Sequence, residues 1–236
     1  MFFKVFCFKS VMLKVDLHLH TKEDNYDNLD YSAKELIDRA VELKFDVLAI
    51  TLHNEIFFSK DLISYAEQKG ILLIPGVELS IEKKHVLLYN VSEDELKELK
   101  KLDDLEKIKN EKNLIIAAHP YYFGSSCLGK KLDKYFRFFD AIEYAHFYYK
   151  FFNPNKKAII TSRKFHKTLV GNSDSHNLYQ FGSTYSLVDS KKDIGSIIAA
   201  IKKGNVEVVS APLSLKLFLK ILFFNLNPKK IFRKLF

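Results

Sequence analysis

The segment Val15–His20 reads VDLHLH, and it places two histidines two residues apart in a short apolar run. Residues at this spacing on a β-strand share a face, so His18 and His20 are expected to point the same way, with Asp16 below them. Such a pair is a natural metal chelate, although an ordinary polar strand edge would show the same pattern. The other strand ends of the chain decide between these two interpretations.

Short apolar runs alternate with amphipathic helical patterns along the 236-residue chain. This alternation predicts an α/β domain with a mainly parallel sheet and helical crossovers, and about seven such units favour a closed barrel over an open sheet. Ser32 and Glu35 form a capping-box pattern at the start of the first helix. Strands are expected at 13–19, 46–51, 71–79, 84–90, 114–118, 140–145, 168–171, 183–188 and 206–209. Helices are expected at 32–44, 58–69, 92–109, 154–166, 191–203 and 213–224.

Polar side chains gather where these strands end, which is where the chemistry of such barrels takes place. Buried imidazoles and carboxylates are costly unless they are paired or bound to cations, and one cation cannot use so many donors. Nitrogen and oxygen donors without a thiolate suit Zn, Mn or Fe. The sequence therefore predicts a multinuclear metal site. The donors are His18, His20, His53, Glu78, His119, Glu143, His146, Asp174 and His176 at strand ends, and His85 at the start of a strand.

In their order along the chain, the motifs HLH, TLHN, GVE, AHP and SDSH resemble those of the PHP (polymerase and histidinol phosphatase) domain superfamily. The resemblance implies the PHP fold, a distorted (β/α)7 TIM-like barrel, with two or three divalent metal ions and hydrolysis of phosphoesters. It implies that Glu78 bridges metals, that Glu143 lies in the outer shell, and that metal-bound water is the nucleophile, so no catalytic side chain is assigned. The metal ligands that it implies are His18, His20, His53, Glu78, His85, His119, Asp174 and His176.

Two positions depart from the family's motifs. Leu52 stands where an acid usually precedes the histidine of the second motif, so the usual outer-shell carboxylate is missing there. Asn25 stands where an Asp usually follows the first motif, and either Asp24 or Asp27 replaces that ligand or the segment is a solvated loop. Around a bridging Glu78 we expect three groups of ligands, which are His18, His20 and Asp174; His119 with His85; and His53 with His176.

The charge of the chain is uneven. Residues 211–236 carry six Lys or Arg and no acid, whereas the whole chain has a net charge of +8. Leu215, Leu219 and Leu222 can share a helical face with Phe218, which predicts an amphipathic basic helix after a hydrolase domain over residues 1–210. This helix either docks on the domain or binds acidic lipid or nucleic acid at a surface. Its apolar run is too short and too charged to span a bilayer.

The expected function is that of a stand-alone metal-dependent phosphoesterase (a phosphatase) acting on a small phosphorylated metabolite, such as a nucleotide or histidinol phosphate. A PHP-type nuclease or exonuclease and a non-catalytic, metal-stabilised binding module are the alternatives, and no obligate protein partner is evident. Two cysteines suggest no disulfide framework and fit a reducing, cytoplasmic compartment. The apolar N-terminus is expected to add an edge strand. The cations that would steer a substrate, or that would simply be solvated, are Lys130, Lys131, Arg137, Arg163, Lys164 and Lys167.

Overall fold

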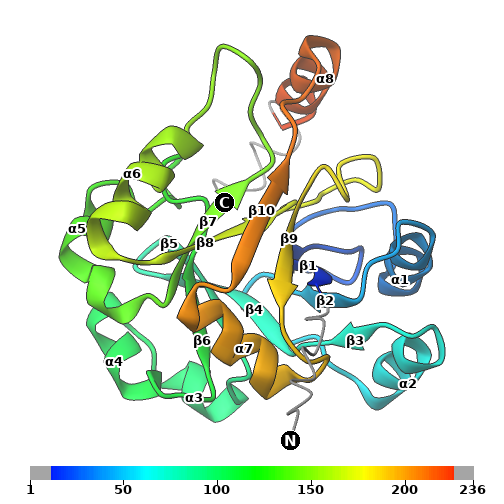
Figure 1. Ribbon diagram of the computed structural model, residues 1–236, viewed down its shortest axis with the longest axis horizontal. Coiled ribbons are helices and arrows are strands. Elements are labelled where there is room, and N and C mark those ends of the chain that lie inside the picture. The colour runs from blue at the N-terminus through cyan, green and yellow to red at the C-terminus, as the bar shows by residue number, and fades with distance from the viewer. Residues whose placement is uncertain (1–11, 226–236) are drawn as a thin grey trace, which may run out of the picture.

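The computed structural model describes residues 12–225 and shows a mixed α/β fold, with helices around two five-stranded sheets (Figure 1). The first sheet has the strand order β10 (Val206–Ser210), β9 (Thr184–Asp189), β1 (Met12–Leu19), β2 (Val47–Ile50) and β3 (Leu72–Leu73). The second has the order β4 (Gly76–Ile81), β5 (Lys84–Tyr89), β6 (Leu114–Ala117), β7 (Ala141–Ala145) and β8 (Thr168–Asn172).

The sheets are mixed, where the sequence predicted mainly parallel strands. Pairs β1–β9, β9–β10, β4–β5 and β5–β6 are antiparallel, whereas β1–β2, β2–β3, β6–β7 and β7–β8 are parallel. Two isolated parallel bridges join the two sheets, Leu19 to Ser175 and His53 to Glu78. The continuous ladders therefore form two sheets and not one closed barrel. Because β1, β2, β6, β7 and β8 run in one direction, their carboxyl ends lie at the same end of the molecule.

Several helices begin at a side chain that caps them. Ser32, Ser59, Ser92 and Asp193 each accept a hydrogen bond from a backbone N–H of the first helical turn, and the capping box of Ser32 with Glu35 is present. The helices are α1 (Ala33–Glu42), α2 (Lys60–Gln68), α3 (Glu93–Lys97), α4 (Leu105–Ile108), α5 (Lys131–Tyr135), α6 (Asn155–Phe165), α7 (Ile194–Lys203) and α8 (Leu215–Asn225).

The apolar core lies on both sides of the sheets. Between the sheets, strand residues such as Leu17, Ala49 and Ile116 belong to one buried cluster with residues of α7 such as Ile198. Helices α1 and α2 bury the outer face of the first sheet, and α3, α4 and α5 cover that of the second. This packing holds the strand ends, and the polar residues on them, in fixed positions.

Three expected elements differ from those observed. The strand expected at 71–79 is split into β3 and β4, because Pro75 between them has no N–H for a ladder. The helix expected at 92–109 stops after α3, since the Asp104 carboxylate accepts two backbone N–H groups just before it and competes with the helical bonds. Helix α5 was not expected. The N-terminal edge strand falls on residues outside the described range.

Helix α8 packs through a small aromatic cluster. The ring of Phe218 stacks on that of Phe147, with centroids 4.6 Å apart, and lies 4.7 Å from the ring of Tyr149. Phe218 is buried, but Leu215 and Leu219 are exposed, so the buried side of the helix is displaced from the one that the sequence predicted. Within residues 12–225 no helix has the length and apolar character needed to cross a bilayer.

Candidate metal centre

An irregularity at the end of β1 aims two imidazoles into the space between the sheets. The register of β1 against β2 shifts between Asp16 and Leu19, so Leu17 packs inside and Leu19 packs on the outer side. His18 and His20, the β1 histidines, are fully buried with their Nε2 atoms 3.1 Å apart. Asp16 serves elsewhere, because it accepts a backbone N–H after β8 at 3.1 Å, and burial raises its pKa to about 7.

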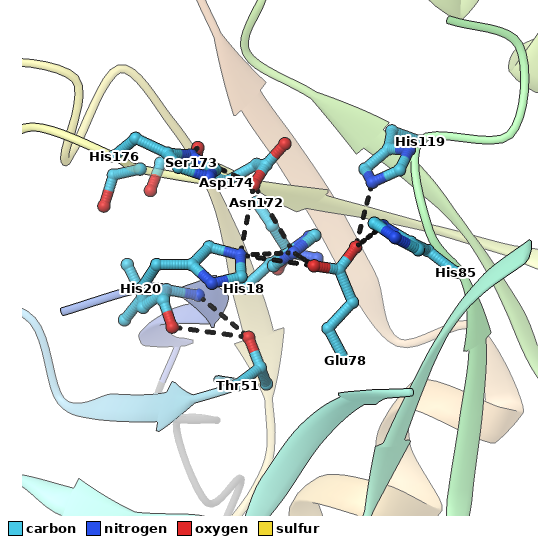
Figure 2. A network of polar contacts seen from close by, with 12 residues as sticks. His18, His20, Thr51, Glu78, His85, His119, Asn172, Ser173, Asp174 and His176 are labelled. Atoms are coloured by element: carbon cyan, nitrogen blue, oxygen red, sulfur yellow. Dashed lines mark hydrogen bonds and ion pairs between the residues drawn. The ribbon is translucent and has the colours of Figure 1, made fainter. Parts of the chain in front are cut away.

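The buried carboxylate of Glu78 lies at the centre of the cluster (Figure 2). Its Oε1 is 2.7 Å from His85 Nδ1 and 3.0 Å from His119 Nε2. Its Oε2 is 3.1 Å from His53 Nε2 and 3.4 Å from the Nε2 atoms of both β1 histidines. Five imidazoles from four strands or strand ends therefore meet the two oxygens of one carboxylate.

Glu143 on β7 orients the imidazole of His18. Its Oε1 accepts hydrogen bonds from His18 Nδ1 and Asn172 Nδ2, both at 2.8 Å, and its Oε2 accepts the backbone N–H of His119 at 2.6 Å. The proton of His18 is thereby assigned to Nδ1, and the Nε2 lone pair faces Glu78. This contact agrees with the outer-shell role expected of Glu143. Nothing in the sequence pattern indicated Asn172.

Asp24 orients two more imidazoles of the cluster, those of His20 and His53. Its Oδ2 lies 3.1 Å from His20 Nδ1 and 2.8 Å from His53 Nδ1, and it also accepts the backbone N–H of His53 at 3.1 Å. Asp24 therefore supplies the outer carboxylate that the motif lacks at Leu52, which is buried in the apolar cluster of α1 and α2. Its position behind the rings, on their Nδ1 side, makes it a support for the imidazoles.

The last motif completes the other side of the cluster. Asp174 Oδ1 lies 3.4 and 3.5 Å from the Nε2 atoms of the β1 histidines. His176 Nε2 lies 2.9 Å from Asp27 Oδ2, so Asp27 is the acid that stands beside this histidine. His119 and Asp174 have φ angles of 24° and 45°, a left-handed backbone that is strained in residues other than glycine and tends to occur at functional sites.

The electrostatics of the cluster favour positive charge at its centre. Burial alone would raise the pKa of Glu78, but the imidazoles of His85 and His18 help to hold that pKa well below its usual range. Burial alone would lower the pKa of each β1 histidine, but the surrounding carboxylates raise both values well above normal. Protons and divalent cations would therefore compete for the same Nε2 lone pairs.

The donor set fits divalent cations. Ligands about 2.0–2.2 Å from one ion lie roughly 3.0–3.5 Å from each other, close to the spacings around Glu78. Two buried atoms, His85 Nδ1 and Asp27 Oδ2, lie near an opposite charge yet make no hydrogen bond with any residue of the described range, as expected for atoms that face a cation. Donor atoms lie within 4.8 Å of one another in three groups, which are His18, Glu78 and His119; His18, His20 and Asp174; and His20, His53 and Glu78.

The groups agree only partly with those expected from the sequence. His18, His20 and Asp174 come together as expected, and His119 and His85 meet at Glu78. His53, however, groups with His20 and Glu78, whereas His176 faces Asp27. The reason is that the two loops that carry His53 and His176 approach the ring of His20 from separate directions, each stacking on it at 4.6 Å.

Cys127 lies beside the cluster although the sequence pattern did not indicate it, and two of the lysines expected to steer a substrate have other neighbours. Cys127 Sγ lies 3.5 Å from His119 Nδ1, although its loop, SSCLG, carries no recognisable motif. Lys164 pairs with Asp133, and Lys167 lines a shallow cavity at the start of β8, the end opposite to the metal centre. Lys167 therefore lies away from the metal centre, and the steering of substrate by these cations stays a prediction.

His146 follows β7 and joins none of the three groups. Its ring is buried, and neither nitrogen has a hydrogen-bond partner among the residues of the described range. Burial lowers the pKa of this imidazole to about 4, and the nearby carboxylate of Asp174 offsets only part of that effect. The histidine is therefore neutral at physiological pH.

Most of the chain matches two known protein families. Residues 16–159 match the PHP domain, and residues 152–206 match the PHP-associated region. The chain belongs to the PHP domain family. This confirms the resemblance found from the ordered histidine motifs. An uncharacterized protein from Methanocaldococcus jannaschii is 27% identical over 129 residues, which is 51% of this chain and 75% of that relative.

Solved structures share the PHP fold at lower identity. A two-domain protein from Bacteroides vulgatus ATCC 8482, described as containing a predicted PHP-like metal-dependent phosphoesterase, matches with a TM-score of 0.67 and 18% identity over 91% of this chain and 70% of its own. PsfC from Pseudomonas syringae PB-5123 matches with a TM-score of 0.61 and 17% identity over 95% and 98%. These matches show that the two solved structures and this chain share a common fold.

Proposed function

We propose that this PHP protein is a metal-dependent phosphoesterase that hydrolyses the phosphate ester of a small metabolite, such as a nucleotide or histidinol phosphate. The observation that carries the proposal is Glu78, a buried carboxylate whose two oxygens meet nitrogens of five imidazoles. A carboxylate with these neighbours would bridge bound cations, and clustered cations suit the hydrolysis of phosphoesters.

The chain's own residues would hold and orient two or three ions of Zn, Mn or Fe. Bound there, the ions would bring the pKa of a water ligand toward neutral and offset charge on the phosphate oxygens. Glu78 stays ionised because its pKa is held low, and Glu143 and Asp24 keep Nδ1 of their histidines protonated. No side chain is assigned as a nucleophile. The proposed ligands are His18, His20, His53, Glu78, His85, His119, Asp174 and His176, with Asp27 added beside His176.

The proposal includes the finer architecture, a distorted (β/α)7 barrel formed by β1, β2 and β4 to β8. The two isolated bridges support it, because they link β2 to β4 and β1 to the segment after β8, which are the two junctions that a ring of these strands needs. The metal ligands then surround the mouth of the barrel, as in other α/β barrels.

Phosphate release from a panel of phosphoesters tests the function. The protein is stripped with chelator, reloaded with Mn²⁺, Zn²⁺ or Fe²⁺, and offered mononucleotides, nucleoside bisphosphates, histidinol phosphate, a chromogenic monoester and oligonucleotides. We expect turnover that depends on metal and is at least about 100-fold lower in His119→Ala. Turnover on oligonucleotides alone would favour the nuclease, and metal binding without any turnover would favour the binding module.

His166→Ala is the matched control. Both histidines have positive φ, 24° for His119 and 52° for His166, so the backbone penalty of alanine is similar, but His166 is exposed at the end of α6. The control variant should keep full turnover and full metal content by elemental analysis. Full activity in His119→Ala would contradict the proposed ligand scheme.

A further inference from the structure

Helix α8 has a second apolar side that no residue of the described range covers. Leu215 and Leu219, one turn apart, are 56% and 39% exposed, while Phe218 faces the body of the protein. Lys216 and Lys220, beside them on the helix, are also exposed. A helix that is apolar on more than one side is normally buried, so the side with the two leucines lacks a partner among the residues that the structure describes.

Two exposed aromatic rings extend this apolar surface onto neighbouring loops. Phe123 and Phe151 are 86% and 82% exposed. Phe123 stacks on Phe152, with centroids 5.3 Å apart, and Phe152 lies 5.9 Å from Phe218 of α8. Tyr149 lies between Phe151 and Phe218, at 6.1 and 4.7 Å. Figure 1 shows the loop between β7 and α6 rising toward the same end of the molecule as α8.

Positive charge accompanies this surface. Lys216 and Lys220 flank the exposed leucines, and Lys150 lies beside Phe151 with its Nζ 5.6 Å from the ring centroid. From residue 211 to the C-terminus the sequence has six Lys or Arg and no Asp or Glu. Exposed leucine and phenylalanine next to lysine is the composition of helices that lie in the interface of an anionic membrane.

We propose that α8 and the loops of Phe123 and Phe151 form a docking surface for an anionic lipid bilayer. Leu215, Leu219 and the two phenylalanines would enter the boundary between headgroups and acyl chains, and the lysines would contact the lipid phosphates. A nucleic acid would satisfy the lysines but would give the leucines no apolar phase. Lys220 Nζ also lies 4.3 Å above the ring of Tyr179, in the loop that follows His176, so the docked surface borders the metal centre.

A tryptophan probe tests the surface directly, because the chain has no Trp. Leu219→Trp, in the full chain, should shift its emission to the blue with vesicles that contain phosphatidylglycerol and should be quenched by brominated acyl chains. Val41→Trp on α1 is the matched control, since Val41 is 40% exposed on another part of the surface, and its emission should not change. Phe151→Trp, in a loop, gives a second probe if the helix variant folds poorly, as judged by circular dichroism.

Charge variants separate the lysines from the apolar contacts. Lys216→Gln with Lys220→Gln should weaken vesicle binding about 25-fold at low salt, from about fivefold for each lysine near the surface. Lys97→Gln with Lys107→Gln removes the same charge from α3 and α4, and it should leave binding unchanged. Added salt should weaken the wild type.

Three results would overturn the proposal. The first is Leu219→Trp emission that does not respond to anionic vesicles. The second is a blue shift that grows with protein concentration without lipid, which would mean that a second copy of the chain covers the surface. The third is a response to single-stranded oligonucleotides but not to vesicles.

Discussion

Replacing Glu143 with Gln tests whether this buried carboxylate supports metal binding through its hydrogen bond to His18 Nδ1. The carboxylate accepts three hydrogen bonds, from His18 Nδ1, Asn172 Nδ2 and the backbone of His119. A glutamine has one accepting oxygen, so its NH₂ group must face at least one of these donors. In the better orientation, one charge-assisted bond is lost and the N–H of His119 is left unpaired, for a loss of roughly 3 kcal/mol in the free energy of unfolding.

The effect on metal binding follows from the proton on His18. In that orientation the amide oxygen still accepts from His18 Nδ1, but without the negative charge it holds the proton and the ring less firmly, and changes of this kind lower metal affinity or activity about 10- to 100-fold. Calorimetric titration of the stripped protein with Zn²⁺ or Mn²⁺ and urea unfolding measure the two quantities. Glu42→Gln, at an exposed glutamate of α1, is the control and should change neither. Reduced stability with unchanged metal affinity would refute the argument about the proton, and unchanged stability would refute the hydrogen-bond count.

Three further predictions follow from the same cluster. Leu52→Asp restores the acid of the family's motif but places a carboxylate in an apolar cluster, and Asp24 already orients His53. We expect the free energy of unfolding in urea to fall by about 3 kcal/mol, with no gain in phosphate release. A more active variant would contradict this. The pKa of His146 is depressed to about 4 in the folded state, so the unfolded chain takes up its proton first, and stability is lost as pH falls from about 6.5 to about 4. The loss amounts to about 3 kcal/mol, and His146→Leu should remove it when unfolding is compared at pH 7 and at acid pH; an unchanged pH dependence would count against the buried neutral ring. Removing metal with chelator should lower the melting temperature in scanning calorimetry, since ions present at about 1,000 times their Kd add about 4 kcal/mol to stability, and an unchanged melting temperature would argue against a metal centre.

Much of the fold could be predicted from local patterns. Strands such as β1, β5 and β6 begin and end within a residue or two of the expected bounds, because short apolar runs with polar ends are local signals. The split at Pro75 and the break of the helix at Asp104 were missed, since each depends on where the backbone N–H groups find their partners. Sheet direction was missed for the same reason, because pairing is a property of distant segments.

The sequence by itself determined which donors the chain carries and the order in which strands present them, because motifs such as HLH and SDSH are contiguous. Only the tertiary structure decided which carboxylate serves which imidazole. Glu143 reaches His18 across 125 residues of sequence, and Asp24 reaches His53 across 29, through contacts that no local pattern encodes. It also decided which side of α8 is buried, because the ring of Phe218 docks on aromatic side chains of a loop more than 60 residues earlier and turns Leu215 and Leu219 outward.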